Sequence, residues 1–148
     1  MAATGSRNDP YAAFNFLVEI DGVTVAGFSE CGGLVSETNV IEYRTGMEDT
    51  HMRKLPGMKK FNNITLKRGY TNDKALWEWR KKVMDGKTER HSGAITLLNE
   101  SRQAALRWTF REAWPTKWEG PAFNAKNNEV AIESIEIAIE DLKLEQAG

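Results

Sequence analysis

Apolar residues recur at every second position near the start of the chain. Phe14, Phe16, Val18 and Ile20 alternate with more polar neighbours, which is the period of a half-buried strand. Asp21-Gly22 follows, and residues of this type tolerate the backbone of a tight hairpin turn. The pattern therefore predicts a first strand that turns back at Asp21-Gly22 into a return strand, Val23 to Phe28.

Further runs with strand character follow along the chain. They are Leu34 to Arg44, Phe61 to Lys67, Ile95 to Asn99, Leu106 to Trp114 and a long run from Val130 to Leu144. In the last run Ile135, Ile137 and Ile139 share one face while Val130 and Ile132 have the opposite phase, so a bulge near Ser134 is predicted.

Two segments are predicted to be loops. Thr45 to Gly57 has no clear period and contains Gly46 and Pro56, so it is interpreted as a long connection. Pro115 and Gly120-Pro121 are interpreted as the bounds of a second loop.

One segment has the period of a helix. Leu76, Trp79 and Val83 fall at i, i+3 and i+7 and form one apolar stripe. Thr71 or Asn72 is predicted to cap the N-terminus of this helix, and Gly86 is predicted to end it.

Seven or eight strands with one helix among them predict a mainly β fold, an antiparallel β-sandwich or barrel with one flanking α-helix. The chain length fits a single domain, residues 11–148, after a flexible N-terminus of residues 1–10. Long edge strands would leave backbone groups unpaired, and charges lie on strand faces that should meet water. We therefore expect the sheet to continue from one subunit into the next. Its polar face would adjoin a water-filled space. The charges in question are Lys67, Arg107, Arg111, Glu136 and Glu140.

Charge and composition exclude several classes of function. The net charge of −1 gives no reason to expect direct binding to nucleic acid or membranes. No basic region followed by an apolar run marks a secretory signal, and no apolar run reaches the length of a membrane span, so synthesis in a cytoplasm is expected. Residues 129–148 hold six acidic side chains against Lys143, which suggests charge complementarity between copies of the protein.

No catalytic or metal-binding pattern is present in the sequence. His51 and His91 have no second His or Cys at metal-ligand spacing, and His91 is interpreted as a surface residue. Cys31 has no recognisable base and is interpreted as a small apolar residue. The sequence predicts a protein that is not an enzyme and that binds no cofactor or metal.

A binding module is the alternative interpretation. Trp114 and Trp118 flank Pro115 and could stack on a sugar or another small ligand in a carbohydrate-binding β-sandwich. Packing of the helix and loops against the sheet is the simpler account of both tryptophans.

A family resemblance runs through eight segments, in order from residue 11 to 144. They are Phe14–Ile20, Phe28–Leu34, Val40–Arg44, Lys54–Gly57, Ile64–Gly69, Trp77–Trp79, Ala113–Pro115 and Asn128–Glu133. Their order and spacing resemble the tail-tube proteins of contractile phage tails and of extracellular contractile injection systems.

This resemblance implies a sandwich with a flanking helix, similar to the ring-forming tube protein of type VI secretion. It implies a structural inner-tube subunit that forms stacked six-membered rings, with no catalytic or metal residues. It further implies as partners a contractile sheath, baseplate or tube-initiator proteins and a tail terminator, with cargo possible in the lumen. Such a protein would be incorporated into a virion tail or an injection particle.

The Thr45–Gly57 segment is the predicted contact between subunits or rings. Met47, Met52 and Leu55 are apolar residues on an otherwise polar segment, and Met adapts well to a partner surface. Arg53 and Lys54 could meet Glu129 or the acidic C-terminal strand of another copy. The five polar-face charges named above are candidates for the lumen or for the outer wall, and the pattern does not choose between them.

Overall fold

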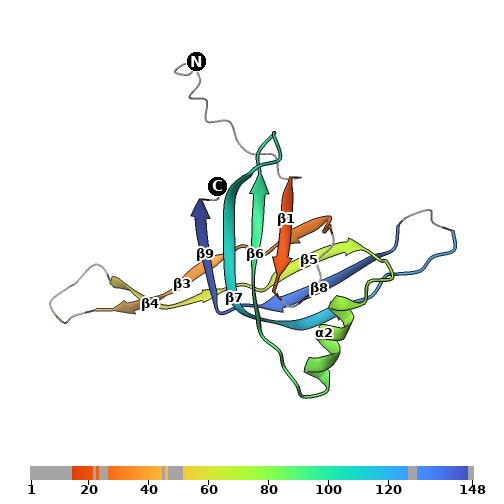
Figure 1. The fold of residues 1–148 in the computed structure, drawn as a ribbon. Helices are drawn as coiled ribbons and strands as arrows, with labels where there is room; N and C mark the ends of the chain where they lie inside the picture. Colours follow the sequence, from red (N-terminus) through yellow and green to blue (C-terminus); the bar gives the residue numbers. More distant parts are fainter. Residues whose placement is uncertain are drawn as a thin grey trace, which may run out of the picture.

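The computed structural model describes residues 15–21, 23, 27–44, 46, 52–126 and 130–146, and within these ranges it contains nine strands and one helix (Figure 1). In chain order they are β1 (Phe16–Ile20), β2 (Glu30–Gly32), β3 (Ser36–Tyr43), β4 (Arg53–Phe61), β5 (Ile64–Gly69), α2 (Ala75–Met84), β6 (His91–Leu98), β7 (Ala104–Glu119), β8 (Ile132–Ala138) and β9 (Asp141–Gln146). The predicted mainly β class with one helix is confirmed. The predicted N-terminal segment, residues 1–10, lies outside the described residues.

Two antiparallel sheets share one long strand. Sheet I has the order β1-β6-β7-β9, and sheet II has the order β7-β8-β5-β2. The 16 residues of β7 serve both, since Leu106–Arg111 pairs with β9 and Trp114–Glu119 pairs with β8. Glu112 lies between these stretches with φ of 56°, a backbone conformation uncommon for a non-glycine residue. The two sheets are therefore joined by a bend within one strand.

The strand β7 passes through Pro115, so the predicted loop at that position is wrong. Beyond Ala113, which still pairs with His91 of β6, β7 is the edge strand of sheet II, and among the described residues it pairs there only with β8. Proline has no N–H to donate, and an edge strand tolerates it because one side needs no ladder bond. The register also shifts between Pro115 and Lys117.

The core lies between the sheets and is completed by α2. Ile64 and Leu66 of β5 are fully buried, as are Ile135 and Ile137 of β8. These residues alternate with outward-facing neighbours, as the sequence pattern requires. From α2, Leu76 and Trp79 are buried against the same cluster. The predicted apolar stripe of the helix is therefore confirmed at these two positions.

The helix begins at Ala75, and the predicted capping by Thr71 or Asn72 is wrong. Lys74 occupies the N-cap without a side-chain bond, and the Asp73 carboxylate accepts a hydrogen bond from the Ala75 N–H at 3.0 Å. Thr71 instead accepts a hydrogen bond from the Asp73 N–H. At the other end, Gly86 has φ of 84° just after the last helical turn, as predicted.

The C-terminal run forms two strands, so the single strand with a bulge near Ser134 is wrong. The break falls at Ile139–Glu140, between β8 and β9. Alternation continues without a bulge through β8, which leaves Ile132 45% exposed and turns Glu133 inward. The alternation of apolar residues predicts the wrong phase here because Glu133, a charged residue, occupies a buried position of β8.

A buried ion pair accommodates this inward charge. Arg68 of β5 and Glu133 of β8 are each 2% exposed and lie opposite each other in register. The Arg68 Nε donates to Glu133, its two other nitrogens donate to Asp73, and Trp118 Nε1 donates to Glu133 at 3.0 Å. Each charge thus has several partners, and the network connects sheet II to the start of α2.

The segment Thr45–Gly57 is not one long connection, because its last five residues belong to β4. Strands β3 and β4 pair with each other as a separate two-stranded ribbon, which projects from the body of the protein on the β9 side (Figure 1). Proline is tolerated at Pro56 because a two-stranded ribbon consists of edge strands. The strand predicted from Phe61 to Lys67 is interrupted at Asn62–Asn63, where β4 gives way to β5.

Close packing at Gly93 provides a test of the register of sheet I. A Cβ added there would lie 2.5 Å from both the Glu19 carbonyl oxygen and Cζ of Phe110. Both neighbours are held in the sheet, so we expect Gly93→Ala to lower the free energy of unfolding by about 1–3 kcal/mol. Gly32→Ala is the matched control, because nothing lies within 4 Å of its added Cβ. Equal stability of the two variants in urea unfolding would contradict the register.

Candidate assembly surfaces

The outer strands of sheet I have unpaired edges among the described residues. Strand β1 pairs only with β6, and β9 pairs only with β7, apart from a single bridge between Ile20 and Val23. Backbone N–H and C=O groups therefore point away from the sheet on both sides. Such edges are where another strand can add.

The edges of sheet II are protected. Strand β2 is only three residues long, and a short edge strand offers little for another chain to pair with. On the opposite edge, α2 packs beside β7, and Arg80 donates from Nη1 to the Pro115 carbonyl at 3.2 Å. Sheet I is therefore the sheet available for extension.

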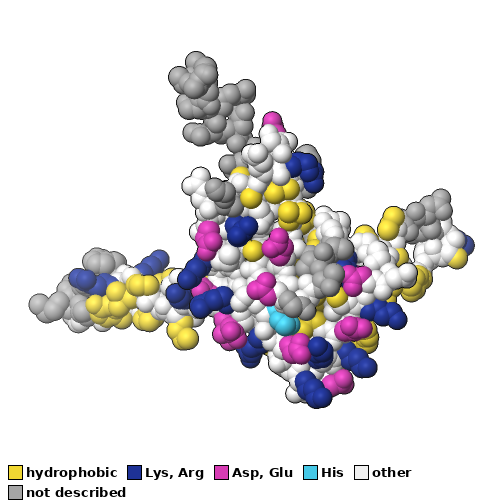
Figure 2. Space-filling model, viewed as in Figure 1, with side chains coloured by type: hydrophobic (Ala, Val, Ile, Leu, Met, Phe, Trp, Pro, Cys, Tyr) yellow, Lys and Arg dark blue, Asp and Glu magenta, His cyan; other side chains and the backbone are white. Residues whose placement is uncertain are grey.

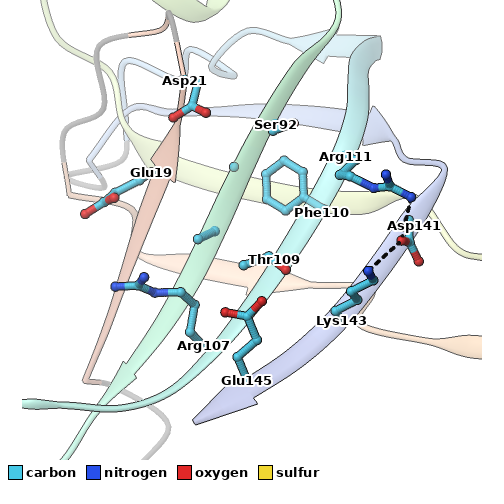
Figure 3. A pocket seen from close by; sticks show the side chains of 12 residues that line it. Glu19, Asp21, Ser92, Arg107, Thr109, Phe110, Arg111, Asp141, Lys143 and Glu145 are labelled. Atoms are coloured by element: carbon cyan, nitrogen blue, oxygen red, sulfur yellow. Dashed lines mark hydrogen bonds and ion pairs between the residues drawn. The ribbon is translucent and has the colours of Figure 1, made fainter. Parts of the chain in front are cut away.

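One face of sheet I is lined by charged and polar side chains from all four strands (Figure 3). They surround a shallow depression of about 410 Å³. The charged members are Glu19, Asp21, Arg107, Arg111, Asp141, Lys143 and Glu145. With four acids and three bases interspersed, this face is polar without carrying a large charge of one sign.

Asp141 is the best-partnered charge on this face. Arg111 Nη2 donates to its carboxylate at 2.8 Å, and Lys143 Nζ lies 4.0 Å away. Desolvation alone would raise the pKa of Asp141, but the hydrogen bonds from Arg111 and the Leu142 N–H, with the charges of Arg111 and Lys143, lower it overall. The lowered pKa keeps the Asp141 carboxylate ionised at neutral pH.

The predicted polar-face residues divide between two surfaces. Arg107 and Arg111 lie on sheet I, whereas Lys67 and Glu136 line a second depression, of about 200 Å³, on the outer face of sheet II. Glu140 lies between β8 and β9 and accepts a hydrogen bond from Arg90 at 3.0 Å. These five charges cannot therefore line one lumen through a single sheet.

The β3–β4 ribbon exposes apolar side chains on both of its faces. Paired residues share a face, so Ile41 lies with Leu55 on one side, and Val40 lies with Pro56 on the other. Figure 2 shows these apolar side chains gathered along the projecting ribbon. The exposed fractions are Val40 60%, Ile41 51%, Tyr43 40%, Met52 49%, Leu55 44% and Met58 78%, with Met52 lying one residue before β4.

The predicted contact residues are partly placed by the structure. Met52, Arg53, Lys54 and Leu55 come together at the outer part of the ribbon, whereas Met47 and Glu129 lie outside the described residues. Sequence reasoning missed Val40, Ile41, Tyr43 and Met58. The available signal was the β3 run itself, whose eight residues are all exposed.

Of the two tryptophans that flank Pro115, Trp118 is engaged in contacts within the subunit. Trp118 contacts Trp77 of α2 with ring centroids 4.9 Å apart and donates to the buried Glu133. No ring contact joins Trp118 to Trp114 among the residues that the structure describes. His91, predicted to be a surface residue, is instead half-buried in β6, and its ring contacts that of Trp79 in a tilted arrangement with centroids 5.3 Å apart.

The described residues contain no group of three or more His, Cys, Asp or Glu side chains placed to hold a metal ion. Cys31 is half-buried, and desolvation raises the pKa of its thiol to about 11, which keeps it protonated. No helix in the described part of the chain is long and apolar enough to span a membrane.

Comparisons with known proteins agree with this geometry. The family model described as T4-like virus tail tube protein gp19 matches residues 12–143. No curated protein sequence matches the chain.

Solved structures with this fold include parts of contractile injection systems. A chain of the PVC extracellular contractile injection system, from its sheath-tube complex in the extended state, is 23% identical with a TM-score of 0.87, and the match covers 99% of each chain. A chain from the anti-feeding prophage tube terminating cap is 27% identical with a TM-score of 0.84, covering 99% of this chain and 100% of that one. Hcp1 from Flavobacterium johnsoniae is 17% identical with a TM-score of 0.54, covering 86% and 94%.

The partners of Asp141 can be tested by titration. Replacing Arg111 with Ala removes a hydrogen bond and a charge that both lower the pKa of Asp141, so this pKa is expected to rise toward or above its ordinary value. Carboxyl NMR of the unassembled subunit measures it. Lys117→Ala is the control, since Lys117 pairs with Glu119 on the other sheet. An unchanged Asp141 titration in Arg111→Ala would contradict the arrangement.

Proposed function

The chain belongs to the T4-like virus tail tube protein family, and we propose that it is the subunit of stacked hexameric rings that form a hollow inner tube. Its role is structural, that of a tail-type tube subunit. As a member of this family it builds a conduit, and we assign no catalytic step to it.

The observation that carries the ring is the pair of open edges on sheet I. Strands alternate in direction across β1, β6, β7 and β9, so β1 and β9 run in opposite senses. A copy related by rotation then places its β1 antiparallel to the first copy's β9. The unit has four strands, an even number, so the alternation is preserved around a closed ring. A cyclic head-to-tail arrangement therefore gives the β1 and β9 edges of every copy a strand to pair with.

The dimensions of such a ring suit a conduit. Six subunits with four strands each give about 24 strands, spaced about 4.8 Å apart and tilted about 40° to the axis. The backbone diameter is then roughly 45–50 Å. Side chains on the inner face narrow this width and leave a channel several nanometres across.

We assign the polar face of sheet I to the lumen. Its opposite face contributes Phe110, Ile95 and Val18 to the apolar core, so only the charged face can border a water-filled space. Arg107 and Arg111 are then lumen residues, while Lys67 and Glu136 of sheet II lie on the outer side of the wall. Interspersed acids and bases would present cargo with a wetted wall of nearly balanced charge.

The wider assembly is proposed from the relatives. Matching chains come from a sheath-tube complex, a baseplate, a tube terminating cap and a sheath/tube terminator. We propose a contractile sheath, baseplate or tube-initiator proteins and a terminator as partners, with cargo in the lumen. The subunit, made in the cytoplasm, would become part of a tail or of an extracellular injection particle.

The β3–β4 ribbon is the proposed contact between copies. An isolated two-stranded hairpin is only marginally stable in water, and this one also exposes seven large apolar side chains along and beside its strands, Val35 directly before β3 among them. A partner surface would cover them and stabilise the ribbon. The predicted contacts Met52, Arg53, Lys54 and Leu55 lie on this part of the molecule, Met47 and Glu129 lie outside the described residues, and all six remain predictions as contacts.

Replacing Met52 and Leu55 with Asp tests this contact. Both side chains are about half exposed in the subunit, so we expect its unfolding free energy to change by about 0.5 kcal/mol or less per site. In the assembly each carboxylate would be buried without a partner at a cost of several kcal/mol. The double variant should therefore remain folded by circular dichroism and form no tubes in negative-stain images.

Met84→Asp is the matched control, because Met84 is 52% exposed on α2, away from the ribbon. Tubes of normal length from the Met52→Asp/Leu55→Asp variant would remove the ribbon as a contact. A wild-type chain that forms no annular particles under any assembly condition would instead contradict the tube itself.

A further inference from the structure

Sheet I extends past the core and leaves part of its apolar face uncovered. Phe110 is buried and faces the core, so Trp108 and Leu106, at alternate positions of β7, face the same side. Their cross-strand partners are Leu97 of β6 for Leu106 and Leu144 of β9 for Trp108, and Phe16 of β1 lies opposite Leu97. We call Phe16, Leu97, Leu106, Trp108 and Leu144 the apolar ledge.

The ledge is less buried than the core beside it. In β7, Phe110 is 1% exposed while Trp108 and Leu106 are only half-buried, and in β9 Leu144 is 60% exposed. Strand ends from all four members of sheet I rise together above sheet II in Figure 1. A depression of about 410 Å³ lies beside the ledge, lined by Phe16, Leu97 and Trp108 together with Cys31 and Leu34. The described residues thus include a hollow lined mainly by apolar side chains.

We propose that the ledge is the surface that receives the β3–β4 ribbon of a second copy; this inference rests on the proposed tube function and names the partner surface of its ribbon. The ribbon gathers seven of the exposed large apolar side chains that the structure describes, and the ledge is a second apolar surface. Four strands spaced about 4.8 Å apart are about 19 Å wide, and an eight-residue strand is about 26 Å long. One ribbon can therefore lie across the whole ledge.

Charge also favours this pairing. The ribbon strands carry four basic and two acidic side chains, a net +2, which leaves −3 on the rest of the chain. Glu30 lines the hollow beside the ledge and is 63% exposed in its side chain, with only a surface pair to Lys67 at 3.4 Å. Lys54, between Met52 and Leu55, is suited to meet such a carboxylate. The acidic body and the basic ribbon favour head-to-tail association of copies.

The ledge also adjoins the proposed ring junction. Phe16 and Leu144 lie on β1 and β9, the two edges through which sheet I would continue. In a closed ring the ledges of neighbouring copies would therefore merge into one apolar belt on the outer side of the barrel wall. A ribbon from another copy would cover this belt and exclude water from it. Pairing of the sheet edges leaves the belt uncovered, and the lumen face lies on the other side of the sheet.

Photo-crosslinking from the ledge tests the proposal. A p-benzoylphenylalanine at Leu144 is assembled into tubes from a mixture of ¹⁵N-labelled and unlabelled full-length chains. We expect it to capture peptides from residues 36–61 of a different copy, with a yield several-fold above the same probe at Met84 of α2. In tubes doped with the Met52→Asp/Leu55→Asp chain, capture of that chain's ribbon should fall to the Met84 background.

Other capture patterns overturn the proposal. Capture of residues 1–14 of the same copy would show that the chain's own N-terminal segment covers the ledge. Capture of a second copy outside residues 36–61, in particles that are annular by electron microscopy, would refute the ledge as the ribbon's receptor while leaving the tube intact. Absence of annular particles from the unmodified chain would instead refute the proposed function.

Discussion

A β-sheet cannot end without leaving backbone donors and acceptors on its outer strands, and this constraint governs the molecule. Sheet II ends in a three-residue strand and in a proline-containing strand beside α2. Sheet I ends in β1 and β9, whose described residues have no such protection. The bend in β7 at Glu112 allows one strand to serve both sheets. Sheet II, whose edges are protected, is therefore joined directly to sheet I, whose edge strands are open. The open layer is the part of the fold suited to a ring.

The distribution of apolar side chains follows the same division. Where the two sheets overlap with α2, side chains such as Ile64, Leu66 and Ile137 are completely buried, and the Arg68–Glu133 pair is enclosed with its partners. Outside this overlap, the ribbon and the ledge keep large apolar groups in contact with water. A monomer gains nothing from such exposure, whereas copies that cover one another gain the hydrophobic free energy of both surfaces. The fold thus divides its apolar residues between a core and exposed surfaces that we assign to contacts with other copies.

Sequence patterns predicted the parts of this structure that depend on local alternation. The strands around Val18, Leu66 and Ile137 and the helix stripe at Leu76 and Trp79 follow directly from period and burial. Pro56 and Pro115 were misinterpreted as loop residues because local pattern does not reveal which strands lie at an edge. The inward position of Glu133 is not predictable from local alternation, because its partner, Arg68, is 65 residues away in the sequence. The placement of Arg107 and Lys67 on two different sheets likewise depends on the order of strands in the sheets. The alternation of apolar and polar residues along a strand does not reveal that order.

The most direct test of this account is a three-dimensional reconstruction of the assembled tube at a resolution that separates strands. The account predicts that β1 of each subunit lies about 4.8 Å from β9 of its neighbour, antiparallel to it, in one continuous barrel. Arg107, Arg111 and Asp141 would then face the lumen. A wall in which β1 and β9 remain unpaired, or in which these three side chains face outward, would contradict the account.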